Sequence, residues 1–162
     1  MRMITVISCL GLTAVMGCGG SSSNSGSSVA QSKMFTVTLS AANETPPCAK
    51  AGAGATGTAT VTIPGDDSSV SVSLTYSGLS GPAVAAHIHF GTAAAAGPIV
   101  LPFSGSLASP INVTLTAANS VAASGAPPDF PTFVAALKAG GAGYVNVHTA
   151  ACPAGEIRAE IE

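Results

Sequence analysis

Apolar and polar residues alternate along much of the chain after Lys33. Val70, Val72 and Leu74 alternate with serines, and because neighbouring side chains of a strand point to opposite faces, this pattern indicates a sheet with one buried face. The Gly-Asp-Asp sequence at 65–67 predicts a hairpin turn between the second and third strands. The pattern predicts eight strands: Phe35–Ser40, Gly57–Ile63, Ser69–Tyr76, Val84–Phe90, Ile99–Phe103, Ile111–Leu115, Gly143–Thr149 and Glu156–Ile161.

Eight short strands at this spacing predict an all-β domain in which antiparallel strands form a sandwich or a flattened barrel. One segment, Pro131–Lys138, has helical spacing instead, with Phe133, Val134 and Leu137 on one face. Its proline suits the first turn of a helix, and the two glycines that follow suit a C-terminal stop. We therefore expect a single short helix that crosses one end of the sandwich.

The first residues predict export. Arg2 gives a short positive start, and the apolar run Ile4–Met16 is too short to span a bilayer but matches a secretory signal core. The residues before Cys18 resemble a bacterial lipobox, so residues 1–17 are expected to be a signal peptide and Cys18 the lipid-modified N-terminus. The alternative is an ordinary signal peptide with an incidental cysteine.

Residues 19–32 read GGSSSNSGSSVAQS and have almost no hydrophobic content. Together with Cys18 they are expected to form a flexible tether, 18–32, in front of a folded domain at 33–162. Gly19 stands where an enterobacterial inner-membrane retention signal has Asp, which favours the outer membrane or the cell surface. We expect an exported protein anchored in the cell envelope by its lipid.

Composition narrows the classes of partner. Charged residues make up 7% of the chain, the formal net charge is −2, and the five Lys and Arg are scattered singly. A nucleic-acid interface needs a basic stripe, so we expect no nucleic-acid partner. A protein partner stays open, because composition does not identify one.

Four cysteines are present. Cys9 would leave with the signal peptide and Cys18 would carry the lipid, which leaves Cys48 and Cys152. In an oxidising compartment two remaining cysteines usually form a disulfide, which here would join the start of the domain to its end. A redox-active or metal-binding pair is the alternative, although the chain has no C-x-x-C spacing.

Three histidines are the strongest chemical signal. His87 and His89 stand two residues apart in a predicted strand, so their imidazoles project from the same face. His148 shares a face with Tyr144 and Asn146 in a later strand, and if the two strands are neighbours the three imidazoles converge. Such a set binds copper or zinc and leaves one coordination position open. The alternative is that the histidines are structural and bond to backbone or hydroxyl groups.

Polar residues near these strands could orient the imidazoles, because a ligating histidine commonly donates its second N–H to a carboxylate or carbonyl. Glu156 and Arg158 share one face of the last strand, and Asn146 lies between Tyr144 and His148. Glu44 is a further acidic candidate in a loop. The alternative for these groups is a solvated or structural role, and an exposed pair of Glu156 with Arg158 would add little stability. The chain shows no nucleophile–base arrangement and no Gly-rich phosphate loop.

Four segments together resemble the CHRD domain family. They are FTVTLSAANETPP at 35–47, AHIHFG at 86–91, GPIV at 97–100 and GYVNVHTAACPAGEIR at 143–158. The resemblance covers about Lys33 to Glu162, and Ala159 departs from it where the family usually has Gly. It implies a Greek-key, immunoglobulin-like β-barrel similar to Cu/Zn superoxide dismutase.

The same resemblance extends to the histidines. His87-Ile88-His89 is similar to the copper-binding H-x-H of that enzyme, and His148 could stand for another copper ligand. The enzyme also uses a fourth copper-site histidine that bridges to zinc, and this chain has none. A site for one ion is therefore expected, with copper as first choice and zinc as second.

Three functions follow from these observations. The leading one is an exported CHRD-domain lipoprotein that serves as a binding module and holds one ion through His87, His89 and His148. The second is a copper-dependent redox enzyme with superoxide-dismutase-like activity, and the third is a structural or adhesive surface domain without metal. We expect binding rather than catalysis.

Overall fold

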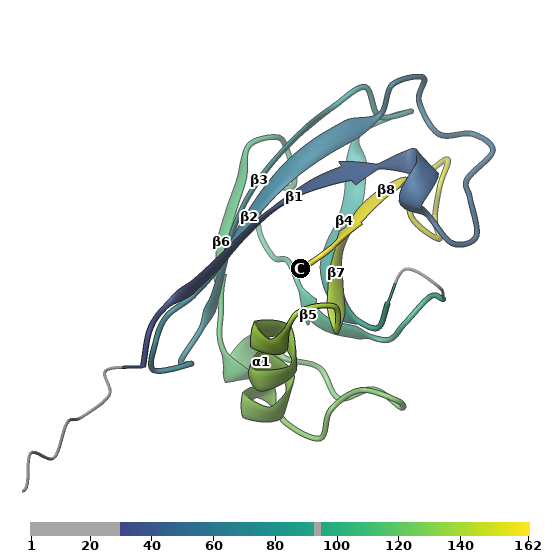
Figure 1. The fold of residues 1–162 in the computed structure, drawn as a ribbon. Helices are drawn as coiled ribbons and strands as arrows, with labels where there is room; N and C mark the ends of the chain where they lie inside the picture. The colour runs from purple at the N-terminus through teal and green to yellow at the C-terminus, as the bar shows by residue number, and fades with distance from the viewer. Residues whose placement is uncertain (1–29, 93–94) are drawn as a thin grey trace, which may run out of the picture.

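The computed structural model describes residues 30–92 and 95–162 (Figure 1). The predicted signal peptide, Cys18 and most of the tether lie outside these residues. The strands are β1 Lys33–Ser40, β2 Thr56–Ile63, β3 Val70–Ser77, β4 Ala83–Phe90, β5 Ile99–Pro102, β6 Ile111–Leu115, β7 Gly143–Thr149 and β8 Ile157–Glu160. The helices are η1 Ala41–Asn43, η2 Ala117–Asn119 and α1 Phe130–Ala139.

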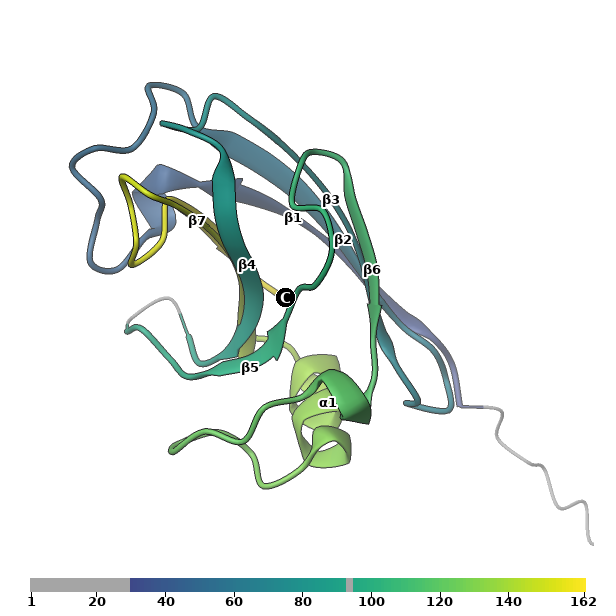
Figure 2. The ribbon, with the colours of Figure 1, turned by 180° about the vertical axis from the view of Figure 1, so that it is seen from behind.

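All eight strands belong to one sheet, with neighbours in the order β5-β4-β7-β8-β1-β2-β3-β6 and every pair antiparallel. The sheet curls into a nearly closed barrel, and α1 lies at one end of it (Figures 1 and 2). β1, β2 and β3 are neighbours in sequence order, whereas β4 and β7 become neighbours only through a long connection that contains α1. The predicted all-β flattened barrel of eight strands and one helix is confirmed.

The ends of the elements follow the turn chemistry of the sequence. Each predicted strand end lies within two residues of the observed one. At the predicted hairpin between β2 and β3, Asp67 has φ 57° and donates its N–H to the Pro64 carbonyl at 3.1 Å. α1 begins one residue before the prediction, because the Asp129 carboxylate caps it by accepting the Thr132 N–H at 2.8 Å.

The apolar positions of the alternating strands form the interior of the barrel. Val37, Ala59, Leu74 and Ile111 stand in one row across four neighbouring strands, and all are buried. Burial of a side chain such as Leu74 stabilises the fold by about 1.5–3 kcal/mol. Phe133, Val134 and Leu137 of α1 are also fully buried, so the helix closes the end of the barrel as its spacing predicted.

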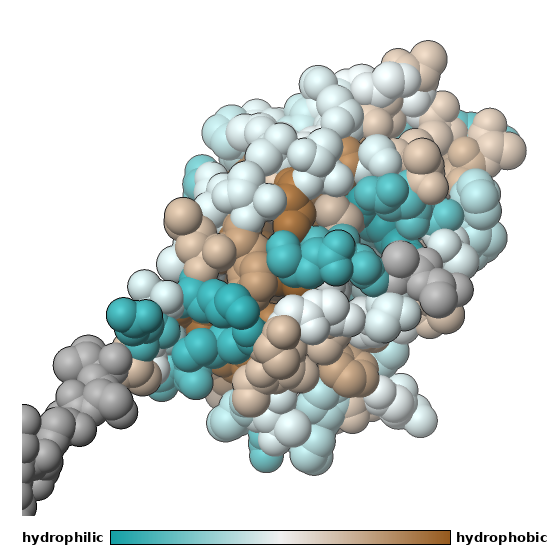
Figure 3. Space-filling view, viewed as in Figure 1, coloured by the Kyte–Doolittle hydropathy of each residue, from teal (hydrophilic) through white to brown (hydrophobic). Residues whose placement is uncertain are grey.

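β7 differs from the other strands because all seven of its residues are buried. Its inward side chains join the core, while its outward side chains lie under the chain segments that cover this part of the barrel. Figure 3 shows hydrophilic residues gathered over β8 and the C-terminal end of the chain. A cavity of about 360 Å³ lies there, and it is lined by Ala42, Asn43, Thr45, Arg158, Glu160 and Glu162.

Among residues 30–92 and 95–162, the structure contains no helix with the length and apolar character that crossing a bilayer requires.

Candidate metal centre

The antiparallel pairing of β4 with β7 brings the three histidines together. In its register His87 lies opposite Asn146, His89 opposite Tyr144 and Ala85 opposite His148. All three imidazoles therefore project from the outer face of the two strands, as expected if these strands were neighbours. His87 and His148 are 61 residues apart in the sequence, and the pairing of β4 with β7 brings them together.

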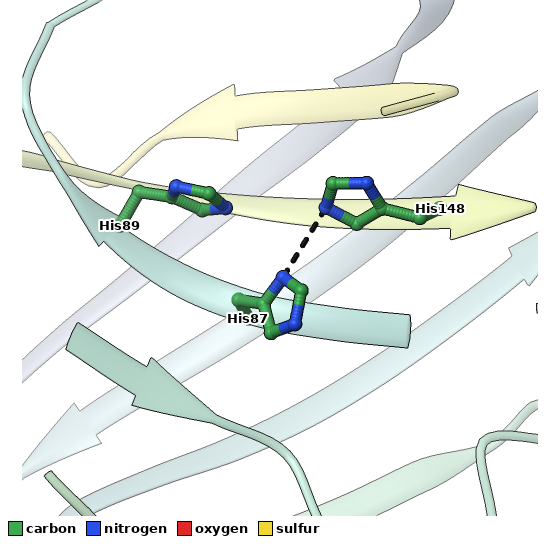
Figure 4. A group of neighbouring side chains, drawn as sticks. All are labelled: His87, His89 and His148. Carbon is green, nitrogen blue, oxygen red and sulfur yellow. Dashed lines mark hydrogen bonds between the residues drawn. The ribbon is translucent and has the colours of Figure 1, made fainter. Parts of the chain in front are cut away.

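The imidazoles point toward one another (Figure 4). The Nδ1 atom of His87 lies 3.2 Å from Nε2 of His148, and one ring nitrogen of each histidine lies within 4.8 Å of the other two. A zinc or copper ion sits about 2 Å from each ligating nitrogen, which requires the nitrogens to lie about 3–4 Å apart. Rotations that close the widest pair by about 1 Å would therefore make this arrangement a three-nitrogen site.

Backbone carbonyls fix the tautomers of two of the rings. Nδ1 of His89 donates to the Gly97 carbonyl at 2.9 Å, and Nδ1 of His148 donates to the Pro153 carbonyl at 3.0 Å. Because a carbonyl can only accept, the proton of each neutral ring is on Nδ1 and the lone pair is on Nε2. Both rings thus present the atom that a metal needs, and Nε2 of His89 is buried with no hydrogen-bond partner.

Burial keeps the three rings in the neutral form that binds metals. Desolvation, followed by the charges of His148 and His89, lowers the pKa of His87 from 6.5 to about 4. Burial also lowers the pKa of His89 and of His148, although their bonds to the carbonyls act in the opposite direction. The cluster is therefore uncharged at neutral pH.

Tyr144 holds His89 from one side. Its ring stacks on the imidazole at a centroid distance of 4.6 Å and an angle of 7°, and the Arg158 guanidinium lies 4.4 Å from the Tyr144 ring centroid. The Tyr144 hydroxyl accepts the Gly97 N–H at 2.9 Å, while the Gly97 carbonyl accepts from His89. A side chain at 97 would clash with the Phe90 carbonyl, since a Cβ there would lie 1.8 Å from that oxygen.

Glu156 takes the structural role that the sequence left open as the alternative to orienting an imidazole. Its buried carboxylate accepts hydrogen bonds from the N–H groups of Gly52 and Ser80 at 2.8 and 2.6 Å, and from the hydroxyls of Ser80 and Thr149 at 2.6 and 2.5 Å. Burial alone would raise its pKa, but these bonds outweigh burial and hold the pKa below the usual value. Glu156 therefore joins two loops to the end of β7.

Arg158 and Asn146 lie on the face of the histidines, but the hydrogen bonds that the structure shows for them run elsewhere. Arg158 donates to the Thr92 carbonyl at 3.4 Å and acts on His89 through its charge, which lowers the pKa of that ring. Asn146 donates through Nδ2 to the Glu44 carboxylate at 2.7 Å. The carbonyls of Gly97 and Pro153, rather than these candidate side chains, accept the Nδ1 protons of His89 and His148.

Glu44 is buried beside this group. Desolvation raises the pKa of its carboxyl group from 4.5 to about 7, against the opposing effects of the Arg158 charge and the hydrogen bond from Asn146. The loop position predicted from the sequence is correct, since Glu44 follows η1. Its contact with Asn146 links the η1 turn to the strand that carries His148.

The disulfide between Cys48 and Cys152 is present, with Cα atoms 5.7 Å apart. It ties the connection between β1 and β2 to the turn after β7. That turn includes Pro153, whose carbonyl holds His148. The predicted disulfide is confirmed, and it restrains the segment that orients one of the three imidazoles.

The fold and this cluster define a class of protein: a small antiparallel β-barrel domain that gathers three histidines on the outer face of two adjacent strands. The sequence matches the CHRD domain over residues 35–161, which include all three histidines. The chain therefore belongs to the CHRD domain family, and the resemblance seen in its motifs is confirmed. Searches of curated proteins and of solved structures found no match to this chain.

Proposed function

We propose that this protein is an exported binding module, anchored by lipid at Cys18, that holds one transition-metal ion through His87, His89 and His148. The observation that carries the proposal is the convergence of three ring nitrogens within 4.8 Å, two of them on rings whose Nδ1 protons are held by backbone carbonyls. Three restrained, neutral imidazoles form a donor set that suits copper and zinc.

Copper is the first choice for the ion and zinc the second. Imidazole binds both ions, and for a given set of nitrogen donors divalent copper is bound more tightly than divalent zinc. The partial burial of the cluster favours an ion that keeps few water molecules. The site has no charged ligand among its three histidines, so the bound ion retains its full positive charge.

Dialysis against Cu(II) or Zn(II), followed by elemental analysis and isothermal titration, tests the metal site. Wild-type protein should bind one ion per chain. His89→Ala or His148→Ala should weaken binding by more than about 100-fold, since even the loss of an outer-shell partner costs 10- to 100-fold. Thr75→Ala, an exposed position on β3, is the matched control and should bind like wild type.

Failure of wild-type protein to bind either ion would refute the metal site. Equal binding by wild type and by both histidine variants would also refute it, because the ion would then be bound elsewhere.

Two features support the proposed location. The N-terminal sequence has the pattern of a lipoprotein signal, and the Cys48–Cys152 disulfide suits an oxidising compartment outside the cytoplasm. Metabolic labelling with a radioactive fatty acid should label the full chain and fail to label a Cys18→Ser variant. Equal labelling of both, or labelling of neither, would contradict the lipid anchor.

A further inference from the structure

Two buried side-chain atoms in the described part of the chain have no hydrogen-bond partner: Nε2 of His89 and Oδ1 of Asn146. Buried polar atoms in folded proteins are nearly always hydrogen-bonded, so each exception calls for a physical reason. The two atoms belong to neighbours on the same face of the sheet, because His89 lies diagonally across from Asn146 in the β4–β7 register. One bound group between them would satisfy both.

Asn146 is next to all three histidines in the register of β4 and β7. His87 lies directly opposite it on β4, and His148 lies two residues further along β7 on the same face. Directly opposed residues of an antiparallel pair have Cβ atoms about 5 Å apart, and diagonal neighbours are a few ångströms further. The side chain of Asn146 therefore projects from the same face of the sheet as the three imidazoles and is a neighbour of each in the register.

The orientation of the Asn146 amide is fixed by Glu44 and by the η1 turn, which packs against β8. Its Nδ2 donates to the Glu44 carboxylate at 2.7 Å, and Glu44 follows the η1 turn, which is tied to β8 by the bond from Asn43 Nδ2 to the Arg158 carbonyl at 3.1 Å. The nitrogen and oxygen of an amide diverge from their shared carbon. With Nδ2 held by Glu44, Oδ1 is the amide atom left free to bind a ligand on this face of the sheet.

Gly155 secures this arrangement. A Cβ at 155 would lie 2.7 Å from Asn146 Nδ2 and 2.7 Å from both carboxylate oxygens of Glu44, and the residue has φ 130°, which strongly favours glycine. Only the backbone of residue 155, without a side chain, fits against the Asn146 amide and the Glu44 carboxylate. The Glu44 carboxylate accepts from Nδ2, and an amide oxygen in that place would face another acceptor, so the amide keeps its nitrogen toward Glu44.

We propose that Asn146 Oδ1 is the fourth donor of the metal centre, which completes a set of three imidazole nitrogens and one amide oxygen. This inference rests on the proposed metal site and adds a fourth donor to it. Amide oxygens of Asn and Gln side chains bind cations, and an amide oxygen serves as a weak axial ligand in some copper centres. Glu44 acts as the positioning residue, because it holds Nδ2 and thereby directs Oδ1.

Cu(II) affinity by competition titration, together with the visible and electron paramagnetic resonance spectra of the loaded protein, tests this role. Asn146→Leu removes the oxygen at similar volume and should weaken copper binding at least about tenfold and shift both spectra. Asn112→Leu makes the same change at an exposed position on β6 and should leave affinity and spectra unchanged. A purely structural role for Asn146 would lower stability in Asn146→Leu without moving the spectra.

Asn146→Asp covers the case in which the leucine variant fails to fold. A carboxylate oxygen in place of the amide oxygen should alter both copper affinity and the two spectra. Wild-type affinity and spectra in either variant would overturn the proposal for Asn146 alone, provided that His148→Ala abolishes binding. If wild-type protein binds no copper at all, the metal site itself fails and the proposal for Asn146 fails with it.

Discussion

At the scale of single residues, the protonation of the imidazoles is set by what surrounds them. Two rings give their Nδ1 protons to carbonyls, and burial disfavours a second proton on any of the three. The result is a cluster of three neutral rings at neutral pH. Without an ion, Nδ1 of His87 donates to Nε2 of His148 at 3.2 Å, whereas Nε2 of His89 is buried with no hydrogen-bond partner.

His87 predicts how the metal-free protein responds to acid. Its pKa is 6.5 in the unfolded chain and about 4 in the fold, so between these values the unfolded chain binds more protons. The contribution of His87 to stability is therefore complete above about pH 6.5 and is lost as the pH falls through about 4. One pKa unit corresponds to 1.36 kcal/mol, so the fall from 6.5 to about 4 makes the loss about 3 kcal/mol.

Urea unfolding of metal-free wild type and His87→Gln at pH 7, 5.5 and 4 measures this effect. The difference in unfolding free energy between the two proteins should shrink as the pH falls, because only wild type carries the titrating ring. Glu44 titrates in both proteins, so its opposite effect cancels in the comparison. A difference that stays constant over the three pH values would contradict the assigned burial of His87.

Asn146 shows what pattern reading could and could not reach at this scale. Alternation in YVNVHT placed Asn146 and His148 on one face, and that was enough to associate the asparagine with the histidines. Its partner Glu44 lies 102 residues away, and no local signal marks that contact. The roles of the Gly97 and Pro153 carbonyls could not be predicted either, because every residue has a backbone carbonyl and no residue type marks the one that accepts.

At the scale of elements, alternation and turn residues were sufficient to predict the strands. In a strand with one buried face, every second residue is apolar and buried. β3 is an example, since its Val70, Val72 and Leu74 are buried. β7 is the exception, since all its residues are buried although its sequence alternates. The polar residues of β7 are buried because other segments of the chain pack on its outer face. The alternation of apolar and polar residues in a strand does not show whether its outer face is covered in this way.

The same limit explains why the sequence left two roles open for Glu156. Its place just before β8 suggested that it could serve the imidazoles, but loop groups that are distant in sequence take up its oxygens. Gly52 and Ser80 each donate a backbone N–H, and they lie 104 and 76 residues from it. The folding of those loops onto the barrel decides the role of the carboxylate.

The disulfide predicts a linked effect on stability and on metal binding. Cys48 and Cys152 are 104 residues apart, and a closed loop of that length stabilises a fold by about 4–5 kcal/mol in the chain-entropy account. A Cys48→Ser/Cys152→Ser double variant should lose stability of that order in urea unfolding. It should also bind copper more weakly, since the turn that carries the Pro153 carbonyl is no longer tethered.

Leu137→Ala separates the two effects, because it destabilises the barrel end without touching the tethered turn. This substitution should cost about 2–5 kcal/mol of stability and leave copper affinity at the wild-type value. If the cysteine variant were destabilised but kept wild-type affinity, the link between the disulfide and the metal site would be wrong.

At the scale of the whole molecule, the order of strands makes the site. After β4 the chain forms the two edge strands of the sheet, β5 and β6, and then α1, and it returns as β7 beside β4. The sequence predicted eight strands and one helix but not this order, since strand pairing depends on contacts between distant segments. The histidine cluster could therefore be stated only as conditional on the adjacency of two strands.

The central claim, that one ion is held by the three histidines, can be tested through Tyr144. The chain has no Trp and two Tyr, so in a Tyr76→Phe variant the remaining tyrosine emission comes from the ring that stacks on His89 at 4.6 Å. Titration of this variant with Cu(II) should quench that emission and saturate at one ion per chain. Addition of His148→Ala should shift the quenching to much higher copper concentrations. Emission that does not respond to copper, or that responds equally with and without His148, would contradict the account.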